Sequence, residues 1–234
     1  MCHYFGVAGS KEHAVSDAVE DYVKAIYKLE SRGGGAVTTN AVAERLGVTP
    51  SSVSAMFRRL DETGLATLAR YRGVHLTEEG RQLALRVLRR HRLLEQFLAE
   101  VLDLSWDRVH DEAEVLEHVL SPELEEVIAA KLGHPVRDPH GDPIPTRDGR
   151  VVEDHTQVLA ALEAGATGRL VRVSDFNPEM LRYLTARGVS LGDRIAVIEQ
   201  QPFGGALLVR FGDQDQVHSI GGDLAKAMRV ELQA

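Results

Sequence analysis

Three prolines and two glycines interrupt the stretch RDPHGDPIPTRDGR, residues 137–150. Because proline fixes φ and lacks a backbone donor, we expect no regular helix or strand to pass through it. Before this stretch, apolar residues recur at helical spacing, and after it short β-branched runs alternate with glycine turns. The sequence therefore predicts a mainly α chain with a β C-terminal part, divided by a Pro/Gly-rich linker over residues 135–154.

Residues 1–77 are predicted to form a winged helix-turn-helix domain. A helix from about residue 17 ends at the glycines 33–35, and a second, over 39–46, stops at Gly47. Thr49 and Pro50 then provide an N-cap and a first helical residue. Helix, glycine turn and helix is the helix-turn-helix pattern, and short runs at 65–68 and 74–76 predict the hairpin of a wing.

Residues 78–134 are predicted to form a helical domain. A long helix of roughly 25 residues follows Thr77, which can cap it, and it is apolar on more than one side, as expected of a helix that packs against a partner. Two further helices are expected, over about 107–120 and from Pro122 to Leu132. Residues 155–234 are predicted to form a small β-barrel, with strands at 170–173, 194–198, 207–211 and 217–220 and a helix at 178–186.

Charge is unevenly distributed along the chain. The formal net charge is -8, which argues against indiscriminate coating of nucleic acid. Residues 58–92 nevertheless contain nine arginines against four acidic residues, whereas residues 106–128 contain eight acidic residues against one arginine. This pattern predicts DNA at the first segment and cations at the second. The one cysteine, the missing secretory signal and the missing apolar run of about 20 residues predict a cytoplasmic protein.

Four metal-ligating residue types share one face of the helix expected over 107–120. They are His110, Glu114, Glu117 and His118, at spacings i, i+4, i+7 and i+8. His91 and Glu95 repeat the i, i+4 spacing on the long helix, and Asp21 lies on the first helix. Converging carboxylates repel one another unless a cation lies between them, so the pattern indicates a metal site. An acidic, solvated surface is the alternative.

The helix that starts at Thr49 is expected to read DNA. In helix-turn-helix geometry its first residues face the major groove, and nearby arginines reach phosphates. The expected groove-facing residues are Thr49, Ser51, Ser52 and Ser54, and the expected phosphate contacts are Arg58, Arg59, Arg70 and Arg72. For the serines, simple solvation of a helix surface is the alternative.

Five segments, in this order, resemble the diphtheria-toxin repressor and manganese-transport-regulator family (DtxR/MntR). They are SSVSAMFRRLDETGL, YRGVHLTEEG, HRLLEQF, VHDEAEVLEHVLS and DPHGDPIP. The segments GATGRLVRVSD, VSLGDRIAVIE and HSIGGDLAKAMRVEL resemble the FeoA-type barrel of the longer members. The resemblance implies a homodimeric, metal-dependent repressor that binds a palindromic operator and is not an enzyme.

The resemblance also implies two metal sites. Its primary site corresponds to Asp21, Glu114, Glu117 and His118, and its ancillary site to His91, Glu95 and His110, with Asp175 as the candidate ligand from the barrel. Iron-responsive members have Met and Cys where this chain has Asp21 and Glu114, and oxygen ligands suit manganese(II) better than sulfur does. Manganese(II) is therefore the predicted cofactor, with iron(II) as the second candidate. Lys24 stands where the two-domain manganese regulators have an acid, so their paired-metal geometry is not expected here.

Two other functions fit parts of the pattern. A winged-helix regulator could sense an organic ligand or a partner protein through its barrel, and metal-independent DNA binding would favour that interpretation. A dimetal carboxylate oxidase also uses helical Glu and His, but through Glu-x-x-His motifs. Val115 and Leu88 stand where such motifs would need Glu before His118 and His91, so the oxidase is disfavoured.

Overall fold

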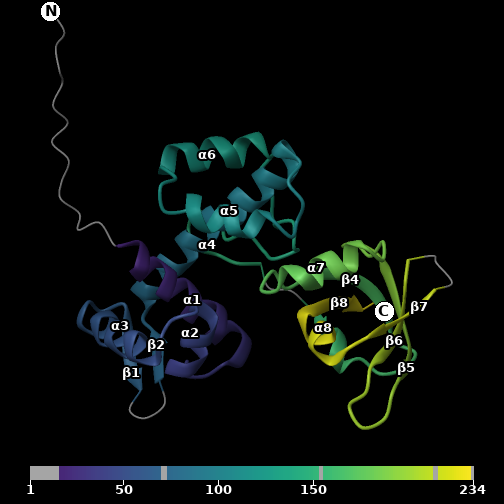
Figure 1. Cartoon of the computed structure of the whole chain (residues 1–234). Helices are drawn as coiled ribbons and strands as arrows, with labels where there is room; N and C mark the ends of the chain where they lie inside the picture. Colours follow the sequence, from purple (N-terminus) through teal and green to yellow (C-terminus); the bar gives the residue numbers. More distant parts are fainter. Residues whose placement is uncertain (1–15, 70–72, 153–154, 213–215, 233–234) are drawn as a thin grey trace, which may run out of the picture. The chain divides into compact units, whose positions relative to one another are not determined.

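The computed structural model describes residues 16–69, 73–152, 155–212 and 216–232 (Figure 1). The chain divides into two compact units, residues 1–87 and 88–234, and each is described by itself. The predicted class, mainly α with a β C-terminal part, is confirmed. No described helix is both long enough and apolar enough to cross a membrane.

Unit 1 has the predicted winged helix-turn-helix. Its elements are α1 (Asp17–Gly33), α2 (Thr39–Leu46), α3 (Pro50–Glu62), β1 (Ala66–Ala69) and β2 (Gly73–Leu76). Gly47 ends α2 with a φ of 65°, and the Thr49 hydroxyl accepts from the amide of Ser52 at 3.2 Å, so both expected helix signals operate. The strands pair antiparallel with Ala66 opposite Leu76. Arg70 and Arg72 lie outside the described residues.

The core of unit 1 fixes which face of α3 stays in solvent. Val53, Phe57 and Leu60 are buried with side chains of α1, α2 and the wing. Because these three residues repeat at helical spacing, the opposite face of α3 carries Ser51 and Arg58 into solvent.

The helical part of unit 2 differs from expectation at one helix. α4 (Glu78–Leu102) has the expected 25 residues and continues from unit 1 into unit 2, and α6 (Pro122–Lys131) starts at the expected Ser121 cap. α5 (Val109–Leu116) is shorter than the predicted helix over 107–120. Residues 117–119 form a turn, and Ser121 and Pro122 then start α6. His118 therefore belongs to that turn and not to the helix of His110.

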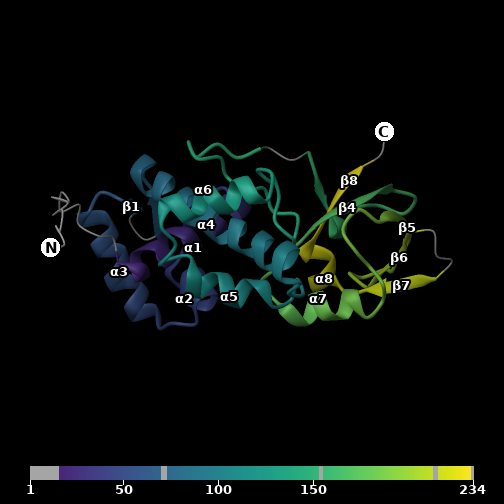
Figure 2. The same cartoon turned by 90° about the horizontal axis from the view of Figure 1, so that it is seen from above.

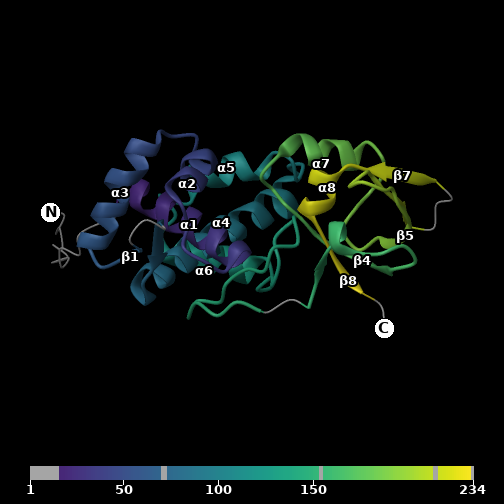
Figure 3. The ribbon, with the colours of Figure 1, turned by 90° about the horizontal axis from the view of Figure 1, so that it is seen from below.

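The C-terminal part of unit 2 is a six-stranded antiparallel sheet with strand order β3-β8-β4-β5-β6-β7. The strands are β3 (Gln157–Val158), β4 (Thr167–Val173), β5 (Arg194–Gln200), β6 (Leu207–Phe211), β7 (Val217–Ile220) and β8 (Met228–Leu232). Irregular register at Leu170/Arg172 and at Val197/Glu199 bends the sheet. Its helices are η1 (Leu159–Ala161), α7 (Pro178–Thr185) and α8 (Gly222–Ala227); α7 and α8 are neighbours beside the sheet in Figure 2, and β8 runs next to β4 in Figure 3.

The Pro/Gly-rich stretch is irregular, as predicted, but it is closely packed. Asp138, His140 and Asp142 are buried in it. The amide of Val173 on β4 donates to the carbonyl of His140 at 2.9 Å. Gly141 has a φ of 85°, and a Cβ there would lie 2.0 Å from the carbonyl oxygen of Val171, so this approach to β4 requires glycine. The stretch thus connects the helices to the sheet through direct contacts.

Candidate metal centre and DNA-reading face

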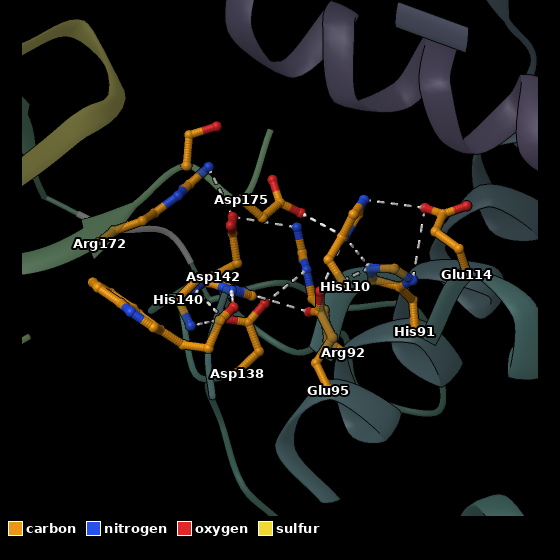
Figure 4. Close-up of polar contacts among 12 residues, drawn as sticks. His91, Arg92, Glu95, His110, Glu114, Asp138, His140, Asp142, Arg172 and Asp175 are labelled. Atoms are coloured by element: carbon orange, nitrogen blue, oxygen red, sulfur yellow. Dashed lines mark hydrogen bonds and ion pairs between the residues drawn. The ribbon is translucent and has the colours of Figure 1, made fainter. Parts of the chain in front are cut away.

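α4 carries two fully buried polar side chains one turn apart, His91 and Glu95 (Figure 4). The imidazole Nε2 of His91 lies 3.0 Å from Oε1 of Glu95. An ionised carboxylate is costly to bury unless charges or hydrogen bonds compensate it. Their burial therefore indicates a site that gathers further polar groups.

Two further side chains complete the first group, which we call the His110 cluster: His91, Glu95, His110 and Asp175. Nδ1 of His110, on α5, lies 3.1 Å from Oε1 of Glu95 and 3.2 Å from Oδ2 of Asp175. Asp175 follows β4 in the C-terminal part and is buried. One ligand atom from each of the four residues lies within 4.8 Å of all the others. The structure thus brings together the set predicted as the ancillary site.

A second group, the His140 cluster, contains Glu95, Asp138 and His140, all buried. Oε2 of Glu95 and Nδ1 of His140 lie 3.8 Å apart, and neither has a hydrogen-bond partner among the described residues. Sequence reasoning missed Asp138 and His140 because it treated their stretch as a linker. The Asp-x-His spacing within it was the available signal.

A third group, the Glu114 cluster, contains His91, Glu114 and Glu117. Nδ1 of His91 lies 2.6 Å from Oε2 of Glu117 and 3.9 Å from Oε1 of Glu114. His118 in the following turn lies 3.5 Å from Glu117. Three of the four residues predicted for the primary site therefore gather within unit 2; Asp21 lies on α1, in unit 1.

The three clusters share residues and are electrostatically coupled. Burial raises the pKa of the Glu95 carboxyl, but His91, followed by His110 and His140, lowers that pKa by more than burial raises it. The pKa of Glu95 therefore lies well below 4.5. Burial lowers the pKa of His140, but Glu95 and then Asp138 and Asp175 raise it, to about 10. For Asp138, burial and then the charges of Glu95 and Asp142 raise the pKa well above 3.8. These opposed directions are those expected of carboxylates crowded around imidazoles.

Two arginines hold the stretch that carries Asp138 and His140. Nε of Arg92 on α4 lies 3.7 Å from Oδ2 of Asp138, and its terminal nitrogens reach Oδ1 of Asp142 at 3.3 Å and the carbonyl of Pro143. Arg172 on β4 pairs with the same Oδ1 of Asp142 at 2.8 Å. The ligand-bearing stretch is therefore fixed from both the helices and the sheet.

The donor set fits a divalent cation. All ligand atoms are carboxylate oxygens and imidazole nitrogens, as manganese(II) and iron(II) prefer, and no cysteine or methionine belongs to any of the three clusters. Oε2 of Glu95 and Nδ1 of His140 are buried and have no hydrogen-bond partner among the described residues, and both could bind a cation, His140 after Nδ1 has lost its proton. The arrangement therefore has the chemistry of a metal centre.

The predicted DNA-reading residues of α3 lie at its solvent-facing start and side. Thr49, Ser51, Ser52, Arg58 and Arg59 are exposed, and Ser54 is half-buried. Within this group the Thr49 hydroxyl contacts those of Ser51 at 2.8 Å and Ser52 at 2.9 Å, and Ser54 donates to the Pro50 carbonyl at 2.9 Å. Ser54 and Arg58 also line a hollow of about 460 Å³ beside Asn40 and the wing.

A winged helix in one unit and a buried cluster of metal-ligating side chains in the other define a metal-responsive DNA-binding regulator as the class of protein. Family models agree in the same order along the chain. The iron dependent repressor N-terminal DNA binding domain matches residues 14–74, the iron dependent repressor metal binding and dimerisation domain matches 77–146, and the FeoA domain matches 157–232.

Relatives match over nearly the whole chain. The diphtheria toxin repressor of Corynebacterium glutamicum is 32% identical over 226 residues, which cover 92% of this chain and 96% of that protein. The iron-dependent repressor IdeR of Mycobacterium tuberculosis is 32% identical over 232 residues, 92% of this chain and 97% of that protein. The chain belongs to the family of metal-dependent repressors that includes these two proteins, and the predicted family is confirmed.

Solved structures place manganese-dependent repressors among its structural neighbours. A manganese-dependent transcriptional repressor in complex with manganese is 43% identical, with a TM-score of 0.88, covering 92% of this chain and 100% of that one. The manganese regulator SloR is 30% identical, with a TM-score of 0.79, covering 92% and 98%. The family thus includes iron-dependent and manganese-dependent repressors of DNA transcription, which are not enzymes. The individual ligand and DNA-contacting residues and the domain boundaries stay predictions.

Proposed function

We propose that this protein is a manganese-responsive, homodimeric transcriptional repressor of metal-homeostasis genes, with iron(II) as the second candidate ion and no catalytic activity. One observation carries the choice of ion: the clusters around His91 and Glu95 contain only oxygen and nitrogen donors. Sulfur donors would favour softer ions, so an all-oxygen-and-nitrogen set supports manganese(II).

The proposed primary ligands are Asp21, Glu114, Glu117 and His118, and the proposed ancillary ligands are His91, Glu95, His110 and Asp175. A bound divalent cation would supply the positive charge that offsets repulsion among these carboxylates. Asp21 belongs to the DNA-binding unit and the other three primary ligands to unit 2. Shared ligation would therefore tie the position of α3 to the helical domain, which makes metal and operator binding mutually reinforcing.

An apolar surface on α5, α6 and the turn between them supports the homodimer. Val115 and Val119 are 71% and 77% exposed, and Val127 on α6 is 58% exposed. These exposed apolar side chains fall within 13 residues of the chain, from Val115 to Val127, and exposed apolar surface of this kind is typical of a protein–protein interface. The match of residues 77–146 to a metal binding and dimerisation domain supports the same surface.

For DNA we propose that α3 enters the major groove of a palindromic operator. Thr49, Ser51, Ser52 and Ser54 would face base edges, and Arg58 and Arg59, with Arg70 and Arg72 of the wing, would contact phosphates. A two-fold dimer presents two such helices, so its operator should contain two half-sites related by the same symmetry.

The decisive experiment is anaerobic titration of operator binding by the full-length dimer with manganese, iron or zinc, with and without chelator. We expect Glu117→Gln to weaken manganese-dependent binding at least tenfold, because Glu117 is buried against His91. Glu112→Gln, at an exposed position of α5 five residues before Glu117, is the matched control and should behave like the wild type. Operator affinity that is unchanged by chelator and by Glu117→Gln would contradict the proposal.

A further inference from the structure

Trp106, the chain's one tryptophan, contacts the C-terminal part through its side chain. It lies between α4 and α5, and its indole Nε1 donates to the hydroxyl of Thr185 at the end of α7, at 2.8 Å. Its ring is half-buried against the core of the sheet domain. Next to it, Asp107 pairs with Arg182 of α7 at 3.3 Å. Two adjacent residues of the helical part thus hold α7.

The same tryptophan contacts His140 through its backbone and its ring. The carbonyl oxygen of Trp106 accepts from Nε2 of His140 at 2.6 Å. The two rings are nearly parallel, with an interplanar angle of 16° and centroids 6.3 Å apart. Since a carbonyl only accepts, Nε2 carries a proton, and Nδ1 is the nitrogen that faces Glu95.

We infer that Trp106 is a positioning residue for the His140 cluster and couples the docking of α7 to metal binding there. This inference rests on the proposed function, because it takes Glu95, Asp138 and His140 as ligands. Ligating histidines typically donate their other ring N–H to a carbonyl or carboxylate, which fixes the tautomer and orientation of the ring. The carbonyl of Trp106 has this role for His140, and Thr185 holds the side chain of the residue that provides it.

The coupling follows from reciprocity. If the Trp106–Thr185 contact favours the orientation of His140 that binds a cation, the bound cation must favour that contact to the same degree. The sheet domain then acts on the His140 cluster without contributing a ligand to it.

Thr185 is exposed, and its hydroxyl also donates to the carbonyl of Leu181. Thr185→Ser can therefore keep both hydrogen bonds, whereas Thr185→Val loses both.

The test is manganese calorimetry on the full chain with Thr185→Val, Thr185→Ser and, as matched control, Thr167→Val at an exposed position of β4. We expect Thr185→Val to weaken one class of manganese sites about tenfold, the effect of losing an outer partner of a ligand. Thr185→Ser and Thr167→Val should stay within about twofold of the wild type by the same comparison. Trp106 emission should shift with manganese in the wild type and lose that shift in Thr185→Val.

A double-mutant cycle separates coupling from a general loss of folding. Trp106→Phe keeps an aromatic ring but loses the indole donor, so it should weaken the same sites, and Trp106→Phe with Thr185→Val should weaken them no further. Additive losses would overturn the coupling. If Thr185→Val fails to fold, Trp106→Phe alone tests the same contact, because it removes the indole donor and leaves Thr185 intact.

Asp138→Asn distinguishes the two ways of failing. If it removes one class of manganese sites while Thr185→Val binds like the wild type, the coupling is wrong and the metal assignment stands. If Asp138→Asn leaves manganese binding unchanged, the assignment of the His140 cluster is wrong, and the coupling is overturned with it.

Discussion

The carboxylate of Asp142 accepts from Arg172 on β4 at 2.8 Å while the same oxygen lies 3.3 Å from Arg92 on α4. A single acidic residue of the Pro/Gly-rich stretch therefore bridges a cation of the helices and a cation of the sheet. Its side chain is 8% exposed, so water replaces little of this interaction if it is lost.

Asp142→Asn should lower the free energy of unfolding by roughly 3 kcal/mol, because the buried guanidinium group of Arg92 and the partly buried one of Arg172 both lose a charged partner. Urea denaturation of the metal-free protein measures this change. Asp223→Asn, which removes an exposed pair with Lys226, is the control and should change stability by less than about 1 kcal/mol. Equal effects of the two substitutions would show that the bridge contributes no more than a surface pair.

Glu95→Gln should reduce manganese binding at two clusters at once, since Oε1 of Glu95 faces the His110 cluster and Oε2 faces His140. Glu114→Gln should reduce manganese binding only at the Glu114 cluster and at the proposed primary site, of which Glu114 is a ligand. Metal content after equilibrium dialysis, compared among the wild type and both variants, measures the difference. A loss of the same size in both variants would argue against separate clusters.

Manganese binding at the His140 cluster should release a proton and tighten as pH rises. The pKa of His140 is about 10 without metal, so at pH 7.5 its Nδ1 is protonated and must lose that proton to bind a cation. Calorimetry in buffers of different ionisation enthalpy counts the proton, and His140→Gln should abolish this contribution. Since this pKa lies above 6.5, His140 stabilises the metal-free fold most below pH 6.5 and loses that contribution as pH rises through 10.

Arg58→Ala and Arg59→Ala should each weaken operator binding uniformly across sequences and reduce the slope of log affinity against log salt by about 1. Both side chains are exposed on α3, so their loss should leave the fold intact. Fluorescence anisotropy at several salt concentrations measures the slope. An unchanged slope would place the phosphate contacts elsewhere.

Val119→Asp should dissociate the proposed dimer, because it replaces an apolar side chain of the proposed interface, 77% exposed in the single chain, with a charged one. Light scattering during gel filtration measures the mass in solution. Val217→Asp, at a 42% exposed valine on β7, is the control and should leave the mass unchanged. A dimeric Val119→Asp variant would move the interface away from the surface of α5 and α6.

Local sequence signals predicted the elements whose boundaries depend on caps. Gly47, Thr49 and Ser121 fix helix ends within a few residues, and β6 and β7 have the expected bounds. The predicted end of α5 was wrong, because Glu117 and His118 keep the helical spacing of ligand-type residues although they lie in the turn after the helix. β8 and α8 were missed as separate elements. The pairing of β8 with β4 is a long-range contact that no local pattern encodes.

The candidate site was only partly accessible to sequence reasoning. Helical spacing found His91, Glu95 and His110, but Asp138 and His140 lie in a stretch where prolines indicate irregular backbone. Irregular backbone there is tightly packed because Gly141 approaches β4 and two arginines neutralise the acids. Such packing depends on partners 30 or more residues away in sequence, so it appears only in three dimensions.

Glu95 directs one oxygen to His91 and His110 and the other toward His140. Rotation of this carboxylate to suit one group of ligands must disturb its alignment with the other. Two ions that share a single carboxylate cannot bind independently, and because each disturbs the alignment that the other needs, total occupancy should change over a wider range of ion concentration than it would at isolated centres. A regulator of this design gives a graded response to the metal supply, and one glutamate sets the breadth of that response.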